Sequence, residues 1–104
     1  MALSTFSVIL LEPVPVFEFG AAVEVFGLDR SADGVPALDL RVCAVNPGVP
    51  LRTANVAPFT ISAAHGLDGV RGSDVVIVSA TPPRGPADYP LEELKLLREA
   101  HADG

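Results

Sequence analysis

The feature that most constrains this chain is a pair of short apolar runs without a single polar residue, at positions 8–11 and 75–78. Runs of this kind are typical of strands covered on both faces, as in a parallel sheet flanked by helices. Two prolines follow the first run closely, and proline cannot continue a strand but is tolerated in the first turn of a helix. The sequence therefore predicts a central strand over residues 6–11 and a helix that begins near Pro15 or Val16.

The expected first helix, residues 16–28, is apolar almost all the way round. Glu18 and Glu24 are its only charged residues. One face must cover the sheet, and the opposite face must contact something other than water. We therefore interpret the second face as a candidate subunit interface, and we expect the helix to end at Gly27 and the polar stretch 29–34.

The residues that follow predict further strands separated by short connections. Apolar and polar residues alternate over positions 38–44, the pattern of a strand with one less buried face. Residues 51–53 and 59–62 are short extended pieces that can pair as a hairpin. Residues 66–70 suit a short helix, and residues 75–78 predict another buried strand.

The last predicted helix carries the clearest end signals. Pro90 suits its first turn, acidic residues lie early and basic residues late, and Gly104 suits a cap. Leu91, Leu94 and Leu97 are expected to form its buried stripe. Strands that alternate with helices favour an α/β fold with a doubly wound, mainly parallel sheet, because right-handed crossovers leave few other arrangements.

Composition argues against several classes of function. A chain of 104 residues with 49% hydrophobic residues is expected to form one domain with one core. Its 7 Lys and Arg against 13 Asp and Glu give a net charge of -6, which repels nucleic-acid phosphates and anionic lipids. No apolar run approaches the roughly 20 residues of a membrane span. We therefore expect this segment to bind no nucleic acid and no membrane.

Cysteine use and the amino terminus favour the cytoplasm. Cys43 is the single cysteine, so no disulfide can form within the chain. The amino terminus also lacks the basic and apolar regions of a secretory signal. A reducing, cytoplasmic location is therefore the expectation.

Glu18 is the candidate catalytic residue, because it lies in the first turn of the helix that follows the first strand. Ligands of open α/β sheets bind beyond the carboxyl ends of the strands, where helix amino termini supply N–H donors. A carboxylate among Val16, Phe17 and Phe19 is expected to be partly desolvated and able to carry a proton. The alternative is that Glu18 only complements the helix dipole and caps the turn.

The other reactive residues give weaker signals. Cys43 lies within a predicted strand, where a lone cysteine is usually a small buried hydrophobe. His65 and His101 are isolated, so no metal site is expected, and no cofactor is implied. The turn after the last buried strand is a weak candidate for ligand binding through the backbone N–H groups of Ala80 and Thr81.

Several local patterns together resemble one known group of proteins. They are residues 14–20 (VPVFEFG), 24–28 (EVFGL), 40–43 (LRVC) and 65–68 (HGLD). In this order they resemble the start of the ThiJ/PfpI superfamily, and most closely the class I glutamine amidotransferase-like sensor domain at the amino terminus of AraC-type transcription regulators. The resemblance covers essentially the whole chain.

The resemblance implies a three-layer, flavodoxin-like fold that is incomplete here. In the superfamily the glutamate of the first helix faces a reactive cysteine on a nucleophile elbow, so the resemblance gives that glutamate's role to Glu18. The elbow follows the helix that here ends near Gly104, and relatives of the regulator type continue into helix-turn-helix modules. Residues 1–104 are therefore expected to be the amino-terminal part of a single domain, without those segments.

The leading hypothesis is a partial sensor and dimerisation domain of an AraC-type regulator, non-catalytic as it stands, that forms a homodimer and responds to a small-molecule effector. The alternative is a fragment of a ThiJ/PfpI-type enzyme, a hydratase or hydrolase whose cysteine lies outside the chain and is tuned by Glu18. Under that alternative, Glu18→Gln in the full-length product should reduce turnover. A third hypothesis is a complete small interaction module without a ligand.

Overall fold

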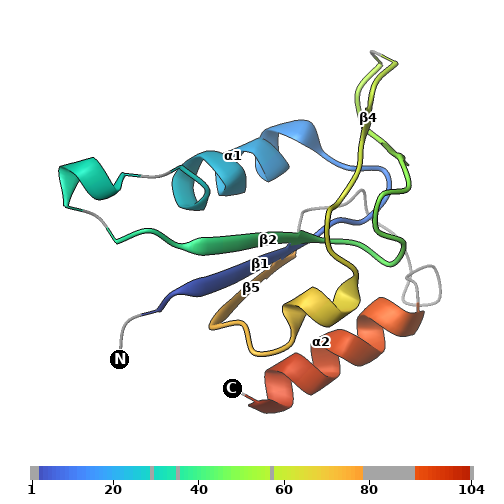
Figure 1. Ribbon diagram of the computed structural model, residues 1–104. Helices are drawn as coiled ribbons and strands as arrows, with labels where there is room; N and C mark the ends of the chain where they lie inside the picture. Colours follow the sequence, from blue (N-terminus) through green and yellow to red (C-terminus); the bar gives the residue numbers. More distant parts are fainter. Residues whose placement is uncertain (1–2, 29, 35, 57, 79–90, 104) are drawn as a thin grey trace.

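The computed structural model describes residues 3–28, 30–34, 36–56, 58–78 and 91–103 (Figure 1). A three-stranded parallel sheet has the order β2 (Asp39–Cys43), β1 (Thr5–Ile9) and β5 (Val75–Val78). The predicted central strand and the mainly parallel α/β sheet are therefore confirmed.

The register of the sheet aligns the apolar centres of its strands. Val8 lies opposite Val42 of β2 and Ile77 of β5, and all three contribute to one core cluster. Because successive side chains of a strand point to opposite faces, Val8 faces one helical layer and Ile9 faces the other. Both residues are fully buried. The first half of the apolar run 8–11 thus belongs to a strand covered on both sides, and Leu10 and Leu11 follow the end of that strand.

Helix α1 (Val16–Phe26) covers one face of the sheet (Figure 1). Phe19 and Ala22 pack against the core on this face, and the ring centroids of Phe6 and Phe26 lie 4.7 Å apart. No residue of the helix is fully buried. One side of α1 is therefore anchored to the sheet while the other side remains in solvent.

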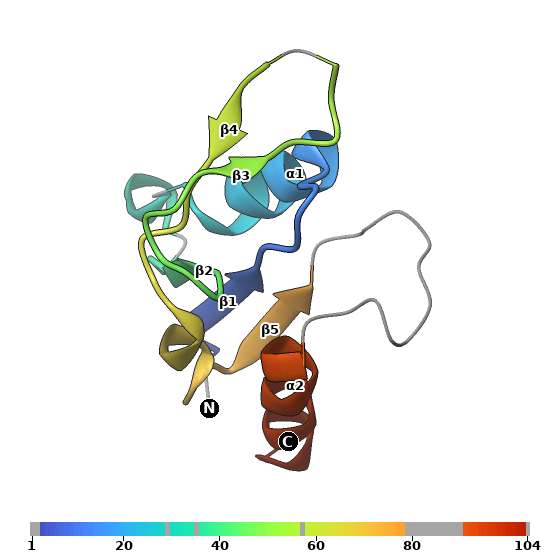
Figure 2. The ribbon, with the colours of Figure 1, turned by 90° about the vertical axis from the view of Figure 1, so that its right-hand side faces the viewer.

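A small antiparallel hairpin of β3 (Leu51–Arg52) and β4 (Thr60–Ile61) lies beside α1 (Figure 2). The hairpin is tied to the link between β1 and α1. The N–H of Val14 donates to the carbonyl of Arg52 at 2.9 Å, and the N–H of Ala54 donates to the carbonyl of Val14 at 2.8 Å. The hairpin predicted from the sequence is confirmed.

Further helical elements in the described part of the chain are η1 (Ser31–Asp33), η2 (Leu67–Val70) and α2 (Leu91–Asp103). Elements η2 and α2 cover the face of the sheet opposite α1 (Figure 1). There Leu96 packs in a buried cluster with Ile9, Cys43 and Val70. None of the helices in the described ranges is long and apolar enough to cross a membrane.

The buried stripe of α2 differs from the predicted one. Glu93 and Leu96 are buried, at 5% and 6% exposure. Leu94 and Leu97 are only half-buried, and the side chain of Leu91 lies outside the described residues. The predicted stripe is confirmed at Leu97, which packs against the core cluster, and wrong at Leu94, because the helix turns to place Leu96 against the sheet. That rotation carries Glu93 into the protein one turn earlier.

A cluster of polar groups connects η2 to β1 on the face of the sheet opposite α1. Ser7 is fully buried, and its hydroxyl donates to the carbonyl of Gly69 at 3.2 Å and contacts the hydroxyl of Ser73. The same carbonyl accepts a hydrogen bond from Nη1 of Arg41 at 3.1 Å. A Cβ at Gly69 would lie 3.0 Å from Cys43 Sγ, so the close approach of η2 favours glycine. These bonds satisfy a hydroxyl that would otherwise be costly to bury.

Asp74 anchors the start of β1, and its contacts predict a pH dependence. Its carboxylate accepts hydrogen bonds from the backbone N–H groups of Ser4 at 2.8 Å and Thr5 at 3.0 Å, which hold the pKa of Asp74 below its ordinary value of 3.8. A lowered pKa stabilises the fold above the ordinary value, and this stabilisation is lost as the pH falls through the folded value. Asp74→Asn should therefore unfold at a lower temperature than wild type at neutral pH, and the gap should close in strongly acidic solution.

Thermal unfolding followed by circular dichroism, from neutral to strongly acidic pH, measures this gap. Asp33→Asn is the matched control, because Asp33 is an exposed residue of η1. The control should follow wild type at every pH. A gap between Asp74→Asn and wild type that does not change with pH would show that the carboxylate charge is not its cause.

Candidate functional site

The carboxyl edge of the parallel sheet is where the topology favours a site. In the order β2-β1-β5, the next strand along the chain, β2, lies on one side of β1, and the later strand β5 lies on the other side. All three strands are parallel, so their carboxyl ends lie at one edge of the sheet. Open α/β sheets bind ligands outside the carboxyl ends of their strands, at such a reversal of strand order. Residues that follow β1 and β2 are therefore the first candidates for ligand contact.

The amino-terminal end of α1 lies near this edge (Figure 1), and Glu18 belongs to the first turn of that helix. Its side chain is exposed, and the side chain of the neighbouring Phe17 is 84% exposed. The prediction that Glu18 is partly desolvated is therefore wrong. The reason is the rotation of α1, which turns Phe19 and Ala22 towards the core and leaves Glu18 on the outside.

A cavity of about 240 Å³ lies at the carboxyl edge, between the ends of β1 and β2 and the first turn of α2. Its lining comes from residues 10–12 after β1, residues 44–46 after β2, Val49, Leu51 of β3 and Glu93 of α2. Glu18 is not among the described residues that line this cavity. The hollow at the edge is thus built from residues that the sequence did not suggest as site residues.

Two carboxylate side chains, those of Glu12 and Glu93, are among the described residues that line this cavity. Glu12 accepts a hydrogen bond from the backbone N–H of Arg52 at 2.8 Å, and Arg52 Nε lies 3.5 Å from the same carboxylate. The backbone hydrogen bond is the main reason why the pKa of Glu12 lies below its ordinary value. Glu93 is only 5% exposed. The described lining contains no basic side chain, but the guanidinium of Arg52 pairs with Glu12 from outside the lining.

Glu93 is the residue that reasoning from the sequence missed, although its signal was present. Glu93, Leu96, Leu97 and Ala100 follow the i, i+3, i+4, i+7 spacing of one helix face. The spacing of the apolar residues alone predicts that the face with Leu94 is buried, because glutamate is rarely found in a protein interior. A glutamate on a buried helix face is uncommon, so its position beside a cavity is informative.

Cys43 is fully buried at the end of β2, and its Sγ lies 3.8 Å from the carbonyl oxygen of Arg41. Burial raises the pKa of the Cys43 thiol, and this outweighs the opposing effects of the Ser7 hydroxyl and the Arg41 charge. A raised pKa disfavours the thiolate, which is the nucleophilic form. The expectation of a small buried cysteine is therefore confirmed.

The thiol of the folded protein is expected to react slowly with Ellman's reagent. Burial both hides Sγ and lowers the thiolate fraction, so coloured product should appear at the rate at which the chain unfolds. In denaturant, Cys43 should then react completely and release one equivalent of coloured product per chain. The Cys43→Ala variant should release no coloured product. Complete labelling of the folded protein within the mixing time would contradict the buried position.

The other suggested site residues do not form a cluster. His65 and His101 are both exposed, the first in a loop and the second in α2. Within the ranges that the structure describes, no group of three or more His, Cys, Asp or Glu side chains is placed to hold a metal ion. Ala80 and Thr81 lie outside the described residues.

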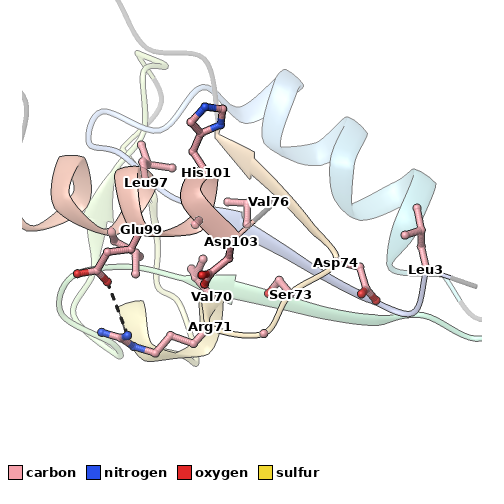
Figure 3. Close-up of a pocket in the computed structure, with 13 residues that line it drawn as sticks. Leu3, Val70, Arg71, Ser73, Asp74, Val76, Leu97, Glu99, His101 and Asp103 are labelled. Atoms are coloured by element: carbon pink, nitrogen blue, oxygen red, sulfur yellow. Dashed lines mark ion pairs between the residues drawn. The ribbon is translucent and has the colours of Figure 1, made fainter. Parts of the chain in front are cut away.

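A larger hollow of about 600 Å³ lies near the amino ends of the strands, between α2 and the turn before β5 (Figure 3). Val76 and Leu97 contribute to its apolar lining. Several of its charges are already engaged in the fold, since Arg71 lies 3.6 Å from Glu99 and Asp74 binds backbone N–H groups.

Comparison with known proteins finds no matching protein family, no matching curated protein and no matching solved structure.

Proposed function

We propose that residues 1–104 are the amino-terminal part of a cytoplasmic sensor and dimerisation domain of an AraC-type transcription regulator, without catalytic activity of their own. The proposal includes a three-layer, flavodoxin-like fold of the class I glutamine amidotransferase type. The parallel order β2-β1-β5, with helices on both faces, supports this fold (Figure 1). The buried thiol of Cys43 supports a binding role over nucleophilic catalysis by these residues.

The observation that carries the proposal is an exposed apolar surface on α1 and the turn after it. We call it the α1 stripe, and it consists of Phe17, Ala21 and Val25, whose spacing of four residues places them on one side of the helix, together with Leu28 in the turn after it. Phe17 is 84% exposed, Val25 62% and Leu28 49%. A surface helix normally presents polar residues on its outer face, and contiguous exposed apolar patches mark interaction sites.

A second copy of the chain fits the α1 stripe. Ala21 lies at its centre, with Phe17 and Val25 one turn away on either side. In an antiparallel pair of helices Phe17 of one copy therefore meets Val25 of the other, which is the self-complementary contact that a two-fold axis requires. Val56 and Phe59, in the connection between β3 and β4, are also exposed.

Sedimentation velocity over a range of protein concentrations tests the dimer. The expected result is a species of twice the chain mass that dissociates on dilution. A monomer at every concentration would remove the main support for the proposal.

A reporter assay tests the same role inside a cell. The chain is fused to a DNA-binding domain that represses transcription only as a dimer, and repression of a reporter gene is expected. The Phe17→Glu fusion should release this repression at equal protein level. A wild-type fusion that is abundant and does not repress would count against a dimerisation domain.

A further inference from the structure

We propose that Glu18 and Glu24 make the dimer formed through the α1 stripe sensitive to ionic strength, so that it is weak in dilute salt and tighter in concentrated salt. This inference rests on the proposed function, because it concerns the regulation of the same surface. It is carried by the positions of the two glutamates on α1, by their exposure and by the lack of any basic residue in that helix.

The two glutamates border the α1 stripe on opposite sides. An α-helix turns by about 100° per residue, so Glu18 and Glu24, placed symmetrically before and after Ala21, lie roughly 60° to either side of it. Both glutamates are exposed, and the exposed side chains of Phe17 and Val25 lie between them. The outer side of α1 is therefore an apolar stripe with a carboxylate at each border.

No ion pair within the described part of the chain neutralises these carboxylates. The ion pairs of the described residues involve neither Glu18 nor Glu24. Arg30 is the nearest basic residue along the chain, and it lies beyond the end of α1, at the start of η1. The net charge of -6 adds a general repulsion between two copies. Both borders of the α1 stripe are therefore negative.

A two-fold axis brings like carboxylates together across the interface. In the antiparallel pair centred on Ala21, Glu18 of both copies lies on one side of the interface and Glu24 of both copies on the other. At a rise of about 1.5 Å per residue, the two members of each pair lie roughly 9 Å apart along the helix axes. This separation is close to the Debye length of about 10 Å at 0.1 M salt. The repulsion therefore acts in dilute salt and is screened in concentrated salt.

Sedimentation velocity in sodium chloride from about 0.01 M to about 0.3 M tests the proposal. The dissociation constant of the wild-type dimer should fall by roughly threefold to tenfold over this range, as expected for two like-charged pairs near a protein surface. The Glu18→Gln/Glu24→Gln variant should dimerise more tightly in dilute salt and lose most of this dependence. Glu92→Gln/Asp103→Asn is the matched control, because it removes the same charge from exposed residues of α2, on the opposite face of the sheet (Figure 1). The control should keep the salt dependence.

A mixing experiment tests the pairing of the glutamates directly. In the Glu18→Lys/Glu24→Lys variant, each lysine again faces a like charge, whereas a mixed dimer with wild type has a lysine facing a glutamate on both sides. Native mass spectrometry of this variant with isotope-labelled wild type in dilute salt should therefore show mixed dimers above their statistical share. The same mixture with Glu92→Lys/Asp103→Lys should show a much smaller excess. All substituted residues are exposed, so every variant should keep its fold, which circular dichroism checks.

The two proposals fail in different ways. A dimer whose dissociation constant is constant or rises with salt would overturn the role of Glu18 and Glu24 and leave the proposed dimerisation domain in place. Equal responses to the α1 and α2 substitutions, or mixed dimers at their statistical share, would do the same. A chain that is monomeric at every salt concentration would overturn both proposals.

Discussion

Replacement of Ile9 by alanine is expected to lower the free energy of unfolding by about 2–5 kcal/mol, the range for such changes in packed cores. Ile9 is fully buried at the end of β1, in a cluster with Cys43, Val70 and Leu96. The substitution therefore removes contacts with β2, η2 and α2 at once. Small domains are stabilised by only about 5–15 kcal/mol, so the variant should lie close to unfolding at room temperature.

Equilibrium unfolding in urea measures this loss. Val56→Ala is the control at equal protein concentration, because the side chain of Val56 is fully exposed and its truncation leaves no cavity. The control should change stability by less than about 0.5 kcal/mol. If Ile9→Ala were no more destabilising than Val56→Ala, that result would contradict the buried position of Ile9 between β1 and α2.

Phe17→Glu is expected to convert the proposed dimer into a monomer. Aromatic residues that are buried in an interface commonly contribute about 2 kcal/mol or more each, and a two-fold dimer carries the change twice. The dissociation constant should therefore rise by roughly a thousandfold. Because Phe17 is 84% exposed and outside the core, the monomer should keep its fold.

Sedimentation velocity gives the dissociation constant, and circular dichroism reports whether the fold is kept. Leu3→Glu is the control, because Leu3 is also a large exposed apolar residue, at 57%, but lies before β1 and outside the α1 stripe. It should remain dimeric. Equal weakening by both substitutions would indicate nonspecific association, and no effect of Phe17→Glu would exclude the α1 stripe as the interface.

Most of the sheet could be predicted from the sequence because the signals are local. The run at 8–11 and the prolines after it lie within one stretch of chain, and they gave the central strand and the start of α1. The short pieces around Leu51 and Ile61 gave the hairpin by the same kind of argument. Apolar periodicity and the backbone restrictions of proline act over a few residues, so both can be interpreted without knowledge of the tertiary fold.

The candidate site could not be predicted in this way, because it depends on how each helix is rotated on the sheet. The sequence suggested a half-buried Glu18 and a leucine stripe on α2, but the structure exposes Glu18 and buries Glu93. Both glutamates lie in the first turn of a helix, so the local sequence predicts the same environment for each of them. The partners that separate them come from strands far away in the chain.

The sequence by itself determined which segments are strands and helices, and that α1 has an apolar outer side. Only the tertiary structure decided which carboxylate lies in water and which lies beside a cavity. The physical reason is that Leu96 fits against Ile9, Cys43 and Val70. This fit sets the rotation of α2, and it involves residues that no local pattern connects.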